Sequence, residues 1–175
     1  MRVSIQGKKA LVTGASRGIG KAIVIDLIKN GAEVIGTARR IQNLEKLNNE
    51  FIDYKDKFSI IPADLSVNED VHQLCDTIKN RVDDLDIIVN NAAVFYFERL
   101  EDITDEMLEN SFAVNVLAPI KICRAFAPAM AEKRWGRIIN VCSSSAYFGG
   151  GTEGHCVYSP TKHALLGFSR ALDDE

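Results

Sequence analysis

Short apolar runs alternate along the chain with longer segments in which apolar residues recur every three or four positions. Within the short runs, such as "ALVTG" and "DIIVN", polar and apolar residues do not alternate, and such continuous apolar runs are typical of parallel strands buried on both faces. The longer segments have the period of helices that cover such a sheet. We therefore predict strands at residues 9–13, 33–37, 58–62, 86–90 and 137–142.

Helices are predicted between and after these strands, at residues 18–30, 67–82, 104–133 and 158–175. Asn30, followed by a glycine, is a C-terminal stop signal for the first helix. Ser66 and Glu69 have the spacing of a capping box at the start of the second helix. Pro119 and Pro128 lie inside the third segment and predict a kink or a break there.

This order of elements predicts an α/β fold, a Rossmann-like, doubly wound parallel sheet with helices on both faces. The 175 residues are enough for one domain with a sizeable core, and no linker, repeat or low-complexity segment divides them. We predict a single domain over residues 1–175. Because the last helical pattern has no stop signal, we expect the chain to stop inside a helix and to leave one sheet edge uncovered.

The composition excludes several other classes of protein. With 46% hydrophobic and 26% charged residues, the chain is neither disordered nor fibrous. It has no run of about 18 apolar residues and no signal-peptide core, so we predict a cytoplasmic protein without a membrane span. The formal net charge is -3 and the basic residues are scattered, which predicts no nucleic-acid partner.

The cysteines and histidines lack the spacing of a metal site. The four cysteines are widely separated, with no Cys-x-x-Cys pair: Cys75, Cys123, Cys142 and Cys156. The three histidines also lack a paired spacing. We predict reduced thiols and no bound metal.

The segment "TGASRGIG", residues 13–20, lies directly between the first strand and the first helix. Gly14 and Gly18 permit tight backbone geometry beside a phosphate, and Gly20 permits close packing of the helix. The free amides at a helix N-terminus attract an anion. Three residues separate the first two glycines, whereas one separates them in the usual dinucleotide fingerprint. A glycine turn without a ligand is the alternative interpretation.

Tyr158 and Lys162 are four residues apart, so they share one face of the last helix. A nearby ammonium group favours the phenolate and lowers the pKa of a tyrosine from its ordinary value of about 10. The pair is therefore a candidate acid/base unit. A solvated helix face is the alternative interpretation of the same pair.

Together these motifs resemble the classical short-chain dehydrogenase/reductase family. Other motifs of that family follow in order along the chain: "ADL" at 63–65, "NNAA" at 90–93, Asn115, the serines at 143–145 and "YSPTK" at 158–162. The resemblance implies an oxidoreductase that transfers a hydride between a nicotinamide cofactor and a small carbonyl or secondary alcohol. A truncated or non-catalytic cofactor-binding protein is the alternative.

The resemblance also implies a role for each catalytic residue. Tyr158 would exchange a proton with the substrate, and Lys162 would lower the tyrosine pKa and bind the nicotinamide ribose. Asn115 would hold a water in the proton relay; a mid-helix amide facing solvent is its alternative. Ser143 follows the fifth strand directly and would polarise the carbonyl, although the family's usual distance from the tyrosine points to Ser145. We predict Ser143.

The predicted cofactor-binding residues are Gly14, Ser16, Arg17, Gly18, Ile19, Gly20, Arg39, Asp64, Leu65, Asn91, Ala92, Tyr158 and Lys162. An acidic residue at the end of the second strand would favour NAD(H), because it binds the ribose 2'-hydroxyl and repels a 2'-phosphate. This chain has Ala38 there, followed by Arg39 and Arg40, and Arg17 lies in the glycine loop. Guanidinium groups match phosphate geometry, so we predict NADP(H) over NAD(H).

The substrate site is less specified. Its candidate lining residues are Phe95, Tyr96, Phe97, Tyr147, Phe148 and His155, with ordinary packing as the alternative. Chains of the family continue past the tyrosine helix, so the resemblance implies that C-terminal strands of the fold are missing here. It also implies a homodimer or homotetramer.

Overall fold

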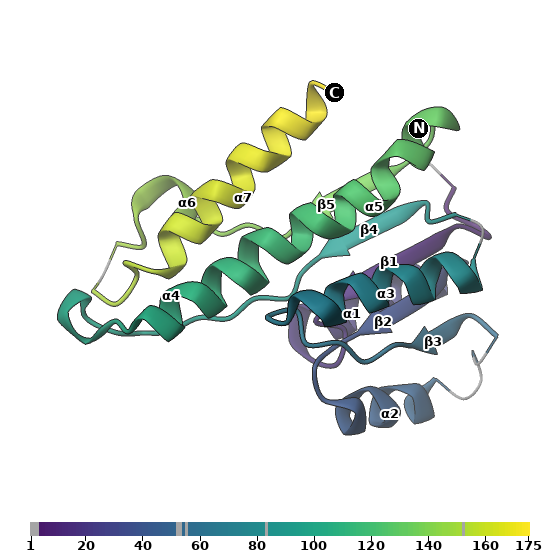
Figure 1. The fold of residues 1–175 in the computed structure, drawn as a ribbon. Coiled ribbons are helices and arrows are strands. Elements are labelled where there is room, and N and C mark those ends of the chain that lie inside the picture. The colour runs from purple at the N-terminus through teal and green to yellow at the C-terminus, as the bar shows by residue number, and fades with distance from the viewer. Residues whose placement is uncertain (1–3, 52–53, 55, 83, 152) are drawn as a thin grey trace.

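The computed structural model of the protein describes residues 4–51, 54, 56–82, 84–151 and 153–175. All five predicted strands form one parallel sheet in the order β3-β2-β1-β4-β5 (Figure 1). The strands are β1 (Lys9–Thr13), β2 (Glu33–Thr37), β3 (Phe58–Ile60), β4 (Ile87–Asn90) and β5 (Arg137–Asn140). Both β3 and β5 end two residues earlier than predicted. The strand order reverses between β1 and β4, which is where open α/β sheets bind ligands.

Helices cover both faces of this sheet, as predicted. Residues of α1 (Gly18–Lys29) and α2 (Ile41–Glu50) pack in one hydrophobic cluster, and those of α3 (Asn68–Arg81) and α5 (Ala118–Glu132) pack in the other. The last long helix, α7 (Tyr158–Asp173), is yellow in Figure 1 and runs beside the stretch formed by α4 and α5. The doubly wound, Rossmann-like architecture is therefore confirmed.

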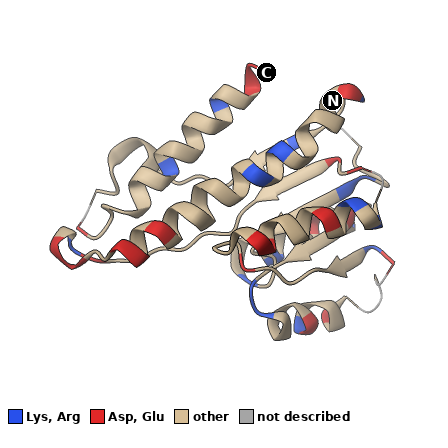
Figure 2. Cartoon of the chain, viewed as in Figure 1, with Lys and Arg blue, Asp and Glu red and all other residues tan. Residues whose placement is uncertain are grey.

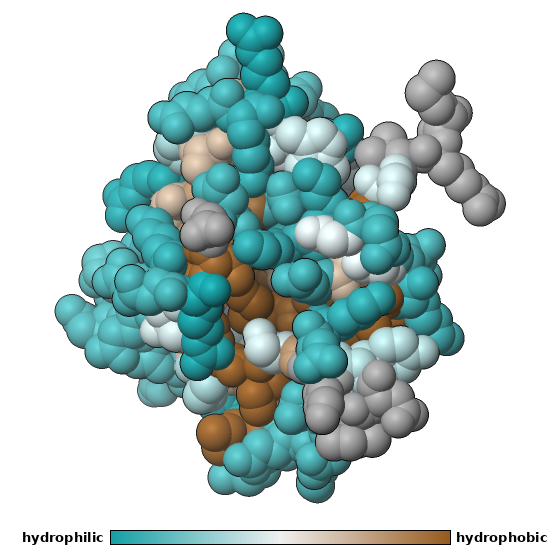
Figure 3. Space-filling model, turned by 90° about the vertical axis from the view of Figure 1, so that its right-hand side faces the viewer, coloured by the Kyte–Doolittle hydropathy of each residue, from teal (hydrophilic) through white to brown (hydrophobic). Residues whose placement is uncertain are grey.

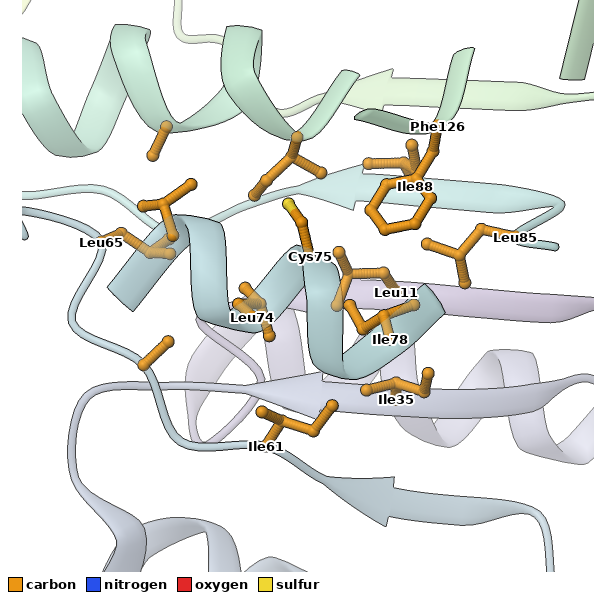
Figure 4. Packing of buried hydrophobic residues seen from close by; sticks show 14 of the residues in the cluster. Leu11, Ile35, Ile61, Leu65, Leu74, Cys75, Ile78, Leu85, Ile88 and Phe126 are labelled. Atoms are coloured by element: carbon orange, nitrogen blue, oxygen red, sulfur yellow. The ribbon is translucent and has the colours of Figure 1, made fainter. Parts of the chain in front are cut away.

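The core under α3 and α5 is shown in Figure 4. Leu74 and Ile78 of α3 and Phe126 of α5 pack over the sheet residues Leu11 and Ile88, all of them nearly inaccessible to solvent. The thiol of Cys75 is also buried there and that of Cys123 is buried beside Asn90, and burial raises the pKa of each to about 11. These two cysteines are therefore uncharged packing groups rather than reactive thiolates.

Two local predictions differ from the structure. The helix α2 was not predicted from the sequence, although Leu44 and Leu47 bury its inner face. The predicted capping box is wrong, because α3 has Val67 at its N-cap without a side-chain cap. The Ser66 hydroxyl instead donates to the Asp64 carboxylate at 2.7 Å.

The third predicted helix is continuous but contains an irregular turn just before Pro119. Thr104 caps α4 (Asp105–Phe112) by accepting from the Met107 amide, and a π-helical turn, Ala113–Leu117, separates α4 from α5. Pro119 stands in the first turn of α5, whereas Pro128 is accommodated inside that helix. The continuous helical stretch Asp105–Glu132 is long and apolar enough to cross a membrane. In this fold the part of the stretch from Val114 to Met130 packs in the core.

Candidate functional site

A cleft of about 760 Å³ opens at the C-terminal ends of β1, β2 and β4. It brings together segments that are far apart in the sequence: the glycine loop, the residues after β2, those after β3 and those after β4. All predicted cofactor-binding residues other than Tyr158 and Lys162 line this cleft: Gly14, Ser16, Arg17, Gly18, Ile19, Gly20, Arg39, Asp64, Leu65, Asn91 and Ala92.

The glycine loop depends on its glycines for two different reasons. Gly14 and Gly18 have φ values of +64° and +54°, in the left-handed region that favours glycine. Gly20 has an ordinary φ, but a Cβ there would collide with the Gly14 carbonyl oxygen and the Asn91 amide. In the described chain no side chain caps the N-terminus of α1, so its first amides remain available to an anion.

Hydrogen bonds fix this loop to the neighbouring strand. The Asn91 side chain donates to the carbonyl oxygens of Thr13 at 2.9 Å and Gly14 at 3.3 Å. In return, the Thr13 hydroxyl accepts from the backbone amides of Asn91 and Ala92, both at 3.0 Å. Asn91 therefore holds the loop that forms the cleft. Thr13 was not singled out in the sequence, because a threonine that ends a strand has no distinctive signal.

The charge at the β2 end of the cleft is basic. Arg17, Arg39 and Arg40 all line it. The Arg39 side chain is 62% exposed, and its Nε lies 4.0 Å from a carboxylate oxygen of Asp64, which follows the neighbouring strand β3. The cleft also contains Asn43 of α2, a residue that sequence reasoning missed together with its helix.

Tyr158 and its neighbours lie beyond the C-terminal end of β5. Tyr158 is at the first position of α7, and the Ser143 side chain is close enough to act on its hydroxyl and lower its pKa. Ser145 is buried and supports Ser143 instead, because its amide donates to the Ser143 Oγ at 3.1 Å and its own Oγ accepts from that atom at 3.2 Å. Of the two candidate serines, the structure therefore brings Ser143 to the tyrosine.

Lys162 is 2% exposed, and its ammonium donates to the Val141 carbonyl at 2.7 Å. It lies 5.6 Å from the centre of the Tyr158 ring. The expected lowering of the tyrosine pKa does not occur here: burial raises the pKa of Tyr158 and outweighs the Ser143 hydrogen bond, which lowers it. Burial likewise lowers the pKa of Lys162. The pair shares a face as predicted, but desolvation dominates at both groups.

Asn115 is fully buried within the π-helical turn, so it does not face solvent. Its Oδ1 accepts from the Val94 amide at 2.8 Å, and its Nδ2 donates to the Val94 carbonyl at 2.9 Å and to the Thr161 hydroxyl at 3.0 Å. The Thr161 hydroxyl then donates to the Tyr158 carbonyl at 2.7 Å. The side chain thus joins the β4 loop to the tyrosine helix. Because Pro119 has no N–H, it cannot form the usual bond to the Asn115 carbonyl.

The aromatic residues that were predicted to line the substrate site occupy three different places. The rings of Phe95, Phe97 and His155 pack against one another, and Phe95 also packs against Tyr158. Tyr147 and Phe148 contact each other on α6 (Ser145–Phe148). Tyr96 instead accepts a hydrogen bond from Asn110 at 2.6 Å.

A second hollow on the surface is much smaller than the cleft. A hollow of about 100 Å³ lies at the opposite end of the sheet, where β1, β2 and β3 begin. Figure 3 views this end and shows a strip of hydrophobic residues with polar residues on both sides. Within the described residues, no group of three or more His, Cys, Asp or Glu side chains is arranged to hold a metal ion.

Comparison with known proteins gives a consistent result. The family model described as short chain dehydrogenase matches residues 8–175. The chain belongs to the short-chain dehydrogenase family. This short-chain dehydrogenase is 35% identical over 171 residues to the 3-oxoacyl-[acyl-carrier-protein] reductase FabG of Haemophilus influenzae, covering 98% of this chain and 69% of that protein.

Solved structures of the family have the same architecture. A short-chain dehydrogenase from Streptomyces avermitilis matches with a TM-score of 0.89 and 33% identity, over 98% of this chain and 61% of the other. A metagenomic short-chain oxidoreductase in complex with NADP matches with a TM-score of 0.89 and 32% identity, over 97% of this chain and 76% of the other. This short-chain dehydrogenase therefore spans about two-thirds of the length of these relatives.

Proposed function

We propose that this short-chain dehydrogenase is an NADP(H)-dependent oxidoreductase of the carbonyl reductase type, acting on a small carbonyl compound or secondary alcohol. The observation that carries the proposal is the arrangement of Ser143, Tyr158 and Lys162 at one end of the sheet that also forms the glycine-loop cleft. The uncapped start of α1 and the left-handed glycines fit a bound pyrophosphate. We further propose that residues 1–175 act as one cofactor-binding domain.

The side chains divide the reaction between them. The nicotinamide supplies or accepts the hydride when the cofactor is bound. Because burial raises the pKa of Tyr158, its hydroxyl is protonated at neutral pH and is ready to donate to a carbonyl oxygen. The Ser143 hydroxyl beside it would polarise the same oxygen. Lys162, held at the Val141 carbonyl, would bind the ribose and stabilise the phenolate after the proton has left.

NADP(H) is proposed over NAD(H) because of the charges around the end of β2. Arg39 and Arg40 follow Ala38, and Arg17 faces the same cleft from the glycine loop. A 2'-phosphate would receive charge-assisted hydrogen bonds from such guanidinium groups. The structural relative solved in complex with NADP is consistent with this choice.

The proposal is tested with Tyr158→Phe. This variant removes the acidic hydroxyl and keeps the ring, so we expect it to bind NADPH like the wild type and to lose carbonyl reduction by a factor of at least about 100. NADPH binding is measured by fluorescence titration and turnover by loss of NADPH absorbance. Unchanged turnover in the variant would show that another group moves the proton.

We also propose a cytoplasmic protein that forms a homodimer or homotetramer. Leu117 is 46% exposed, and Leu166 and Phe168 on the neighbouring helix are partly exposed, which leaves apolar area on this side for a second copy. Light scattering coupled to size-exclusion chromatography checks the assembly. A monomer at micromolar concentration would contradict it.

A further inference from the structure

Phe95, Phe97 and His155 form an aromatic cluster directly beside Tyr158. The Phe95 ring centre lies 4.9 Å from the Tyr158 ring and 5.3 Å from the His155 ring, in edge-on and tilted arrangements. The Phe97 ring lies 6.0 Å from His155 and 6.1 Å from Phe95. These separations are those of favourable aromatic pairs. The three rings come from two segments, the loop after β4 and the loop before α7.

The loop before α7 is shaped to receive these rings. Gly154 has a φ of +81°, and a Cβ there would lie 2.7 Å from the Phe97 ring. A Cβ at Gly150, where φ is +101°, would collide with the His155 ring. The Nδ1 of His155 lies 3.1 Å from the Glu153 carbonyl oxygen, which fixes the orientation of the imidazole. The aromatic cluster is therefore a packed wall with defined ring positions.

This wall is open to solvent on one side. Phe95 is 49% exposed and Phe97 is 62% exposed, although phenylalanine is usually buried. The apolar area lies against the side chain proposed to exchange the proton. A carbonyl group within hydrogen-bond distance of the Tyr158 hydroxyl would place its substituent against these rings.

The charges around the aromatic cluster are mostly negative. The segments 94–110 and 147–157 contain one Lys or Arg, which is Arg99. Its guanidinium lies 3.3 Å from Glu153 and 3.9 Å from Glu101. Acidic side chains also lie along α4 and in the turn before it, as Figure 2 shows in red. A substrate carboxylate or phosphate would therefore lack an uncommitted basic partner in these segments and would meet like charge.

We propose that the aromatic cluster selects an uncharged substrate whose carbonyl carbon carries an aromatic ring, an aryl ketone or the corresponding secondary alcohol. This inference rests on the proposed function, because it places the carbonyl at the Tyr158 hydroxyl. An aromatic pair contributes more than its apolar area alone, and its usual strength corresponds to a preference of about two- to tenfold over a saturated ring of similar size.

The test compares three ketones with NADPH: acetophenone, cyclohexyl methyl ketone and 4-acetylbenzoate. We expect kcat/KM to be about two- to tenfold higher for acetophenone than for the cyclohexyl compound, and lowest for the anionic benzoate. Phe95→Leu keeps an apolar side chain but removes the ring, so it should abolish the aryl preference. Phe112→Leu, the same change at another partly exposed position, is the control and should keep it.

A second readout separates this inference from the proposed function. Binding of acetophenone to the protein with saturating NADP⁺ is followed by saturation-transfer NMR. Equal kcat/KM for the aryl and cyclohexyl ketones in the wild type would overturn the inference and leave the proposed function intact. Ring binding that Phe95→Leu weakens, without turnover of any ketone, would support recognition of an aromatic ring by the aromatic cluster but would overturn the proposed function and, with it, the assignment of that ring to a substrate. If the protein neither binds acetophenone nor turns over any ketone, both the inference and the proposed function are overturned. The wild-type ranking decides even if Phe95→Leu does not fold.

Discussion

Thr161 is a buried link between α7 and the π-helical turn, and its replacement by valine tests how much that link stabilises the fold. The side chain is inaccessible to solvent, accepts from the Asn115 amide at 3.0 Å and donates to the Tyr158 carbonyl at 2.7 Å. Valine has nearly the same shape. Thr161→Val therefore removes the hydroxyl and creates little or no cavity.

The expected loss of stability follows from the Asn115 N–H group that Thr161→Val leaves without an acceptor. Asn115 has two N–H groups on Nδ2, and after the substitution only the bond to the Val94 carbonyl would remain for them. Leaving a buried donor without a partner costs about 1 to 3 kcal/mol. For a chain of this size each kcal/mol lowers the midpoint of thermal unfolding by about 2 to 4 °C. The Tyr158 carbonyl loses the hydrogen bond from the Thr161 hydroxyl, which adds a smaller loss of stability.

The assay is chemical and thermal unfolding of Thr161→Val beside Thr161→Ser, which keeps the hydroxyl and loses a methyl group. We expect the valine variant to be less stable than the serine variant. The double variant with Asn115→Ala should cost less than the sum of the single changes, because both remove the same bond. A valine variant as stable as the wild type, or strictly additive effects, would refute the assigned link.

The other predictions concern the cofactor, the glycine loop and pH. Arg39→Ala should weaken NADPH binding about tenfold and leave NADH binding unchanged. Both affinities are measured by fluorescence titration, with Arg81→Ala as the control. Equal losses of affinity for the two cofactors would contradict the assignment of Arg39 to the 2'-phosphate. Gly20→Ala should destabilise the protein by about 1 to 3 kcal/mol in urea unfolding, and an unchanged midpoint would show that the loop can move aside. Burial alone would raise the pKa of Asp86, but its bonds to the Lys9 amide and to the Lys133 and Lys8 ammonium groups hold that pKa below its ordinary value. The charged form therefore stabilises the fold above the ordinary aspartate pKa, and this contribution is lost as the pH falls through the lowered pKa. Urea unfolding should show that Asp86→Asn costs most at neutral pH and less in acid, and a cost independent of pH would contradict this.

The sheet could be predicted from the sequence because parallel strands covered on both sides are continuously apolar. Residues 34–37, for example, are all buried in the sheet. In contrast, α2 was missed because the segment is short and mostly polar, although its few apolar residues, Ile41, Leu44 and Leu47, recur every three positions as in a helix. The Ser66 capping box had the right spacing, but the nearby Asp64 carboxylate competes for the hydroxyl. A local motif cannot show such a competitor.

The candidate site could be predicted where backbone geometry requires a residue type. Gly14 and Gly18 have left-handed backbones that few other residues adopt. The direction of the Tyr158 pKa shift could not be predicted, because burial is a property of the folded chain and here it outweighs hydrogen bonding. The arrangement of Thr13 with Asn91, and of Thr161 with Asn115, also depends on which segments the fold brings together.

The bonds between Thr13 and Asn91 separate two tasks of the cleft. They fix the glycine loop across β1 and β4, whereas Arg39 lies at the end of β2 and is 4.0 Å from Asp64, which follows the neighbouring strand β3. The Arg39 side chain, which would distinguish one dinucleotide from another, takes no part in the bonds between Thr13 and Asn91. A substitution of Arg39 should therefore alter the proposed cofactor preference while the bonds that hold the glycine loop stay in place.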